Sequence, residues 1–103
     1  MIRIIFTDEA RADTLNAFAF YEERRPGLGE RFREHVDLAI SKIQNAPLTY
    51  PLVYRDVRRK LVERFPYAIL YRIYPGVIAI VALMHGRQQS ATWKRRARRS
   101  DPG

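Results

Sequence analysis

The chain has 103 residues, about the size of one domain, and its 47% of hydrophobic residues excludes a disordered polypeptide. The absence of cysteine excludes disulfides and thiolate metal sites, and no apolar run approaches the roughly 20 residues that span a bilayer. The formal net charge of +8 either serves solubility or indicates a negatively charged partner, a nucleic acid or an acidic protein.

The N-terminal part of the chain predicts a short strand followed by a helix. Residues 2–6 are mainly β-branched or aromatic, which is typical of a strand. Thr7 is an expected N-cap, and the helix is predicted from Asp8 to Arg24. Its buried stripe is predicted from residues at helical spacing, namely Ala12, Leu15, Phe18 and Ala19.

A second helix is predicted from Leu28 to Asn45, between the breaker Pro26-Gly27 and Pro47. Its apolar stripe consists of Phe32, Val36, Ala39, Ile40 and Ile43. Two amphipathic helices joined by a short turn indicate an antiparallel helical hairpin.

Residues 47–54 are predicted to form a loop, after which the apolar spacing becomes strand-like. Three strands are expected over Val57–Phe65, Tyr67–Tyr74 and Val77–His85. Tyr74-Pro75-Gly76 has the residue order of a type II turn, and the last strand is apolar on both faces and so expected to be buried on both. The segment Gln88–Arg99 favours a short, optional C-terminal helix.

The order of elements is therefore β-α-α-β-β-β with an optional final helix. The first strand must pair with the later ones across the helical hairpin, because a lone strand would leave its backbone polar groups unsatisfied. We predict a two-layer α+β fold in which the antiparallel helical hairpin packs on a mainly antiparallel sheet. One domain is expected over residues 1–99, with a frayed end over residues 100–103.

The basic residues are concentrated in the second half of the chain. Residues 1–45 hold 7 basic and 8 acidic side chains, a balance of −1, whereas residues 46–103 hold 12 and 3, a balance of +9. A surface for a negatively charged partner is therefore expected on the sheet and the C-terminal tail.

Three runs of sequence resemble the RelE/ParE superfamily of toxins from type II toxin–antitoxin systems. They are FYEERRPGLGERF at Phe20–Phe32, RFPYAILYRIY at Arg64–Tyr74 and HGRQQSATW at His85–Trp93. The resemblance extends from the first strand to Trp93 and implies the β-α-α-β-β-β fold and a cytoplasmic toxin. It also implies two branches of activity: RelE-like members cut messenger RNA in the ribosomal A site, and ParE-like members poison DNA gyrase and are not nucleases.

Cleavage of RNA through its 2′-hydroxyl needs a base, an acid and cations around the phosphate. If the chain is a nuclease, the catalytic candidates are Arg58, Lys60, Arg72, His85 and Arg87. Arg58, Lys60 and Arg72 converge if their strands have a suitable register; the alternative is solvated charge on an exposed sheet face. His85 either performs acid–base catalysis or only ends its strand.

The C-terminal run departs from the nuclease pattern. Relatives commonly read His-Gly-Arg-Arg, whereas Gln88 stands at the second arginine position and cannot neutralise a phosphate. Trp93 lies where a tyrosine acid is expected, and indole has no titratable proton, so it either stacks on a base or anchors a core or interface. The sequence therefore favours the ParE-like, non-enzymatic branch over the nuclease branch, and no catalytic residue is assigned. The expected target-binding residues are Arg58, Arg87, Trp93, Lys94, Arg95 and Arg96.

The resemblance implies a cognate antitoxin, an acidic protein from the adjacent reading frame, which covers apolar surface beside the helical hairpin in a hetero-oligomer. The expected target is DNA gyrase, with the ribosome as the target in the RelE-like alternative. A member with lost or different activity and a basic nucleic-acid-binding domain without toxicity are further alternatives. No membrane, cofactor or metal is expected, since two isolated histidines make a poor metal site.

Overall fold

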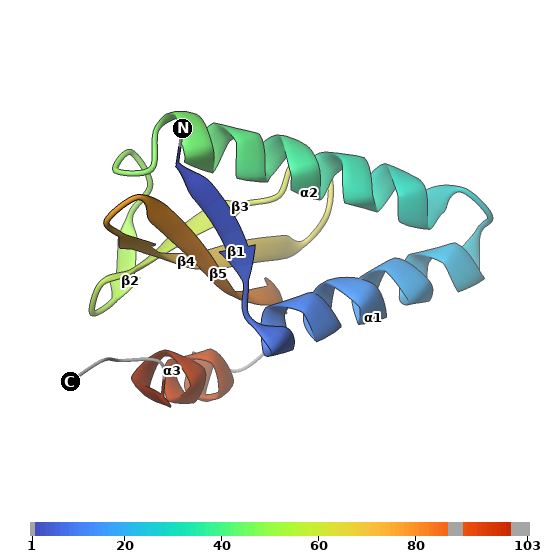
Figure 1. Ribbon diagram of the computed structural model, residues 1–103. Helices are drawn as coiled ribbons and strands as arrows, with labels where there is room; N and C mark the ends of the chain where they lie inside the picture. Colours follow the sequence, from blue (N-terminus) through green and yellow to red (C-terminus); the bar gives the residue numbers. More distant parts are fainter. Residues whose placement is uncertain (1, 87–89, 100–103) are drawn as a thin grey trace.

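The computed structural model describes residues 2–86 and 90–99 (Figure 1). Its helices and strands, in chain order, are β1 (Arg3–Phe6), α1 (Asp8–Arg24), α2 (Leu28–Asn45), β2 (Leu52–Tyr54), β3 (Val57–Leu61), β4 (Tyr67–Tyr74), β5 (Val77–His85) and α3 (Ser90–Arg99). The predicted α+β fold is confirmed: the α1–α2 hairpin packs on a mainly antiparallel sheet, and the optional C-terminal helix is present.

The strands form one sheet in the order β1-β5-β4-β3-β2. As predicted, β1 belongs to the same sheet as the strands that follow the helical hairpin in the sequence. It pairs parallel with β5. The other neighbours are antiparallel, and Gly76 in the β4–β5 turn has a φ of 73°, as the third residue of a type II turn requires.

Two predictions for the edge of the sheet were wrong. Residues 47–54 are not entirely a loop, because β2 pairs with β3 there; a three-residue edge strand is too short to show a periodicity. Strand β3 ends at Leu61 and not at Phe65, since the chain turns through Arg64 with a φ of 68°. The side chain of Phe65 instead packs against Tyr21 and Phe32 of the helical hairpin.

The helical hairpin is held tightly at its turn. The carboxylate of Glu22 accepts hydrogen bonds from the backbone N–H groups of Gly27 and Gly29, at 2.9 and 3.0 Å, and so satisfies donors at the start of α2. A Cβ atom at Gly29 would lie 2.8 Å from the backbone oxygen of Phe18, so only glycine allows the two helices this approach.

Each face of the sheet has its own core. The helical hairpin covers one face, and its core includes Phe32, Val36, Ile43, Ile69 and Tyr71. Helix α3 covers the other face, where Trp93 and Ala97 pack on Val57, Leu70 and Met84. Figure 1 shows α2 above the sheet and α3 below it. The prediction that β5 is buried on both faces is confirmed.

The buried stripe of α2 is the predicted one, with Ile40 partly buried, but the stripe predicted for α1 was wrong. Ala10 and Ala17 are the buried residues of α1, whereas Leu15 is 62% exposed. Apolar residues surround much of this helix, so their spacing does not single out one face. The small side chains face the sheet because they let the helix approach it closely.

Candidate functional site

The open edge of β5 positions the carboxylate of Asp13, which binds groups of two other elements. Strand β1 pairs with β5 only as far as Ile80, and α1 continues along the edge from there. The backbone N–H of Thr7 donates to the oxygen of Ile80, and the N–H of Leu83 donates to the carboxylate of Asp13 at 3.1 Å. The side chain of Asp13 in α1 thus satisfies a backbone group of β5 that would otherwise lack a strand partner.

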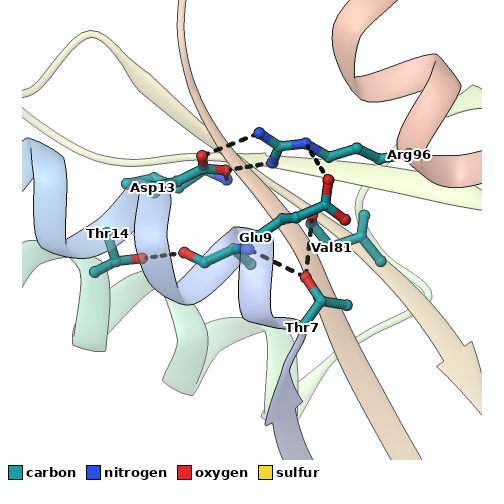
Figure 2. A network of polar contacts seen from close by, with 8 residues as sticks. Thr7, Glu9, Asp13, Thr14, Val81 and Arg96 are labelled. Atoms are coloured by element: carbon teal, nitrogen blue, oxygen red, sulfur yellow. Dashed lines mark hydrogen bonds and ion pairs between the residues drawn. The ribbon is translucent and has the colours of Figure 1, made fainter.

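The same carboxylate anchors α3. The guanidinium of Arg96 donates to both oxygens of Asp13, at 2.6 and 3.2 Å, and lies 3.4 Å from the carboxylate of Glu9 (Figure 2). The side chains of Arg96 and Asp13 are only 17% and 16% exposed. The hydrogen bond that Arg96 donates to Asp13 raises the pKa of Arg96 above its ordinary value. Arg96, predicted to bind the target, therefore holds α3 against α1.

Arg72 anchors α3 from the sheet. Its side chain is fully buried, and its guanidinium donates to Asp56 at 2.8 Å and to the backbone oxygen of Ala97 in α3 at 2.7 Å. The register pairs Arg58 with Tyr71, so Arg72 lies on the opposite face of the sheet from Arg58 and Lys60. The register therefore does not allow these three residues to converge.

Arg58 and Lys60 lie on the helical-hairpin side and contact the 47–51 segment. Arg58 donates to the backbone oxygens of Tyr50 and Leu48, at 2.7 and 3.3 Å. Lys60 donates to the oxygen of Leu61, and its ammonium lies 5.2 Å from the ring centre of Tyr50. Arg58, expected to bind the target, binds this loop in the isolated chain.

His85 lies at the end of β5 beside a pocket of about 360 Å³ between α1 and the sheet. Its ring meets the ring of Tyr67 edge to face, with centroids 5.3 Å apart. Tyr21 of α1 also lines the pocket, and burial raises the pKa of both tyrosines above the ordinary value. Both hydroxyls therefore stay protonated at neutral pH.

The C-terminal residues predicted to bind the target divide into partly buried and exposed ones. Trp93 packs edge to face on Tyr54 with centroids 5.8 Å apart, which makes it an anchor of the α3 core. Lys94 lies over both rings, at 5.4 and 5.7 Å, and Arg95 is exposed. Arg87, also expected to bind the target, lies outside the described part of the chain, and so does Gln88, where the sequence departs from the nuclease pattern.

An apolar pocket of about 350 Å³ opens between the two helices of the hairpin. Its apolar lining comes from the end of β1 and from both helices, namely Phe6, Leu15, Phe18, Phe32 and Val36. Arg11 and Arg33 are the basic residues of its lining, and Asp37 is the acidic one. This arrangement can hold an apolar stripe whose flanks carry negative charge.

Within residues 2–86 and 90–99, no cluster of three or more His, Cys, Asp or Glu side chains could hold a metal ion. Over the same residues, no helix has the length and apolar character needed to cross a membrane.

Sequence reasoning missed the two aspartates that bind the buried or half-buried arginines. Asp13 lies three residues after Ala10 and four before Ala17, both buried, so a polar residue within the true stripe was the available signal. Asp56 lies in a two-residue turn and gave no comparable signal, because its partner Arg72 belongs to another strand.

Comparison with known proteins places these features in a family. The family model described as ParE toxin of type II toxin–antitoxin system, parDE, matches residues 4–90. A solved structure of the chromosomal ParDE toxin–antitoxin system from P. aeruginosa is similar in fold, with a TM-score of 0.73 at 19% sequence identity. The superposition covers 82% of this chain and 96% of that one. No curated protein sequence matches the chain.

Proposed function

We propose that this chain, which belongs to the ParE toxins of type II toxin–antitoxin systems, arrests growth in the cytoplasm by binding and poisoning DNA gyrase. A cognate antitoxin neutralises it in a hetero-oligomer. The chain acts by binding and not by cutting RNA.

The burial of Arg72 is the observation that favours binding of a target over cleavage of RNA. A ribonuclease of this kind needs several cations exposed around one phosphate. Arg72 is instead fully buried and bonded to α3, on the opposite face of the sheet from Arg58 and Lys60. His85 lies beside α1, whereas Lys60 lies beside α2. The described candidates therefore do not surround a common space, which supports the binding branch.

A supercoiling assay tests this proposal. Purified toxin is added to gyrase, ATP and relaxed plasmid, and we expect a dose-dependent loss of supercoiling together with trapped, cleaved plasmid. A parallel cell-free translation reaction is expected to continue at the same toxin concentrations. Normal supercoiling at a large excess of toxin, with translation arrested and messenger RNA cut at defined codon positions, would establish the RelE-like alternative.

The antitoxin is proposed to fill the apolar pocket between α1 and α2. An amphipathic segment can bury its apolar stripe there. Arg11 and Arg33 in the lining favour acidic residues at its edges, which fits an antitoxin that complements a chain of net charge +8.

Two matched substitutions test the antitoxin site. Leu15 lines the pocket and is 62% exposed, whereas Leu38 is 56% exposed and lies outside the pocket. Titration with the protein encoded by the adjacent reading frame should give at least tenfold weaker binding for Leu15→Asp and little change for Leu38→Asp. Equal effects of the two substitutions would contradict this location, without bearing on the gyrase assay.

A further inference from the structure

The solvent side of α3 and the strands next to it carry a dense set of cations. Arg98 lies four residues after Lys94 and three after Arg95 on the helix, so its side chain neighbours both. Arg55 in the β2–β3 turn lies over the ring of Tyr54, as Lys94 does, so the turn and the helix meet at this ring. We call the group Arg55, Arg59, Lys94, Arg95 and Arg98 the α3 surface.

Arg59 joins this group through the register of the sheet. It pairs with Leu70, whose side chain belongs to the α3 core, so Arg59 projects from the α3 side of β3. Arg55, Arg59, Arg95 and Arg98 are exposed, and Lys94 is half-buried.

Acidic residues of the neighbouring elements are already bonded to other arginines. Asp56 binds Arg72, and Asp13 and Glu9 bind Arg96. Helix α3 contains no acidic residue, although like charges three and four residues apart destabilise a helix by a few tenths of a kcal/mol each. The positive charges of Arg59, Lys94, Arg95 and Arg98 are therefore not neutralised by these neighbours.

The chemistry of the surface favours phosphates over an acidic protein. An acidic helix docks by burying an apolar stripe, and none of the exposed large hydrophobic residues in the described part of the chain lies in α3. Tyr54 and Trp93 pack on each other with cations over their rings, so they are not open platforms for stacking a base. What remains is a set of cations suited to a regularly charged backbone.

We propose that this toxin binds duplex DNA directly through the α3 surface, by contacts to phosphates and without regard to base sequence. The proposal is separate from gyrase binding, because the DNA contact needs no other protein. It gives α3 a use beyond covering the sheet: Arg72 and Arg96 fix the helix so that its other cations form one surface.

Fluorescence anisotropy with a labelled 20-base-pair duplex, in the absence of gyrase, tests the proposal. Five phosphate contacts would give a slope of log affinity against log salt of about −4.5, since each contact contributes about −0.9. The variant K94Q/R95Q/R98Q should bind at least tenfold more weakly, with a slope about 2.7 less steep. The variant R55Q/R59Q, which leaves α3 intact, should reduce the slope by about 1.8.

The matched control is R24Q/R25Q/R31Q, which removes the same charge from exposed positions around the α1–α2 turn, away from α3 (Figure 1). It should keep nearly all of the affinity, and a control that loses as much as K94Q/R95Q/R98Q would overturn the proposal. Absence of binding by the unmodified chain at 50 mM salt, or tighter binding to the single strand than to the duplex, would overturn it as well. Equal binding to an RNA duplex is expected from phosphate contacts and supports it.

Discussion

Replacing Arg96 by methionine removes the charge that joins α3 to α1 and keeps most of the side-chain volume. The two hydrogen bonds to Asp13 are between charged groups that are 17% and 16% exposed. Such bonds contribute about 1.5–3 kcal/mol. We therefore expect the docking equilibrium of α3 to fall by about 10- to 150-fold in Arg96→Met.

The partner substitution is Asp13→Asn, because asparagine still accepts the hydrogen bond from the N–H of Leu83 and removes only the charge. Alanine at this position would also leave that N–H unsatisfied and confuse the two effects. In the double-mutant cycle of Asp13→Asn with Arg96→Met, the coupling energy should be about 1.5–3 kcal/mol. The matched cycle of Glu9→Gln with Arg96→Met should give less than about 1 kcal/mol, since Glu9 is 45% exposed and 3.4 Å away.

The fluorescence of Trp93 reports the outcome directly, because it is the only tryptophan and packs between α3 and the sheet. In a urea titration, the Trp93 transition of each single variant should precede the loss of far-ultraviolet circular dichroism. In the unmodified chain the two transitions should lie closer together. A coupling energy within error of zero, or a Trp93 transition unmoved by Arg96→Met, would refute the assignment of Arg96 as the anchor of α3.

Three further predictions concern stability. Asp56→Ala should lower the free energy of unfolding by up to about 3 kcal/mol, because it removes the carboxylate that binds the buried guanidinium of Arg72. Adding Arg72→Met should recover part of this loss in the same urea titration. Gly29→Ala should lower the free energy of unfolding by about 1–3 kcal/mol, because its Cβ would clash with the backbone. Gly86→Ala, whose Cβ would lie 3.7 Å from the nearest atom, should change the unfolding midpoint little. A larger loss for Gly86→Ala than for Gly29→Ala would contradict the packing described. Burial raises the pKa of Tyr71 to about 12, above the roughly 10 of the unfolded chain, so its contribution to stability is complete below pH 10 and is lost, by up to about 2.7 kcal/mol, as the pH rises to 12. The unfolding free energy of Tyr71→Phe should fall less over this pH range, and an equal fall would contradict the prediction.

Local signals were sufficient for the helices but not for the face that each helix buries. Both predicted helix ranges match the structure, because caps and breakers are read from adjacent residues. The α2 stripe was predicted since its apolar residues gather on one side, whereas α1 is apolar on several sides. What orients α1 is the edge of β5, where Asp13 meets the N–H of Leu83. That contact joins residues 70 positions apart and leaves no periodic trace in the sequence.

The candidate site was harder to predict because it depends on register. Arg58, Lys60 and Arg72 are all basic residues of adjacent strands, and only the pairing of Arg58 with Tyr71 decides which of them share a face. The connection between β3 and β4 is irregular, with a positive φ at Arg64. The sequence alone therefore does not show which residues of the two strands share a face of the sheet. The resemblance to a toxin family supplied the fold, but not the internal use of the arginines.

The arrangement of the arginines also bears on how one fold supports two activities. A cation on the α3 side of β4 can either contact a substrate or hold a helix, and the helix excludes the substrate from that face. In this chain Arg72 bonds to the oxygen of Ala97 and Arg96 bonds to Asp13, so two cations of the basic half fix α3 in place. Covering the sheet in this way moves the remaining positive charge outward, to the solvent side of α3. A surface of that kind presents charge to a large partner and provides no enclosed space around a single phosphate, which supports the binding of a macromolecular target over cleavage.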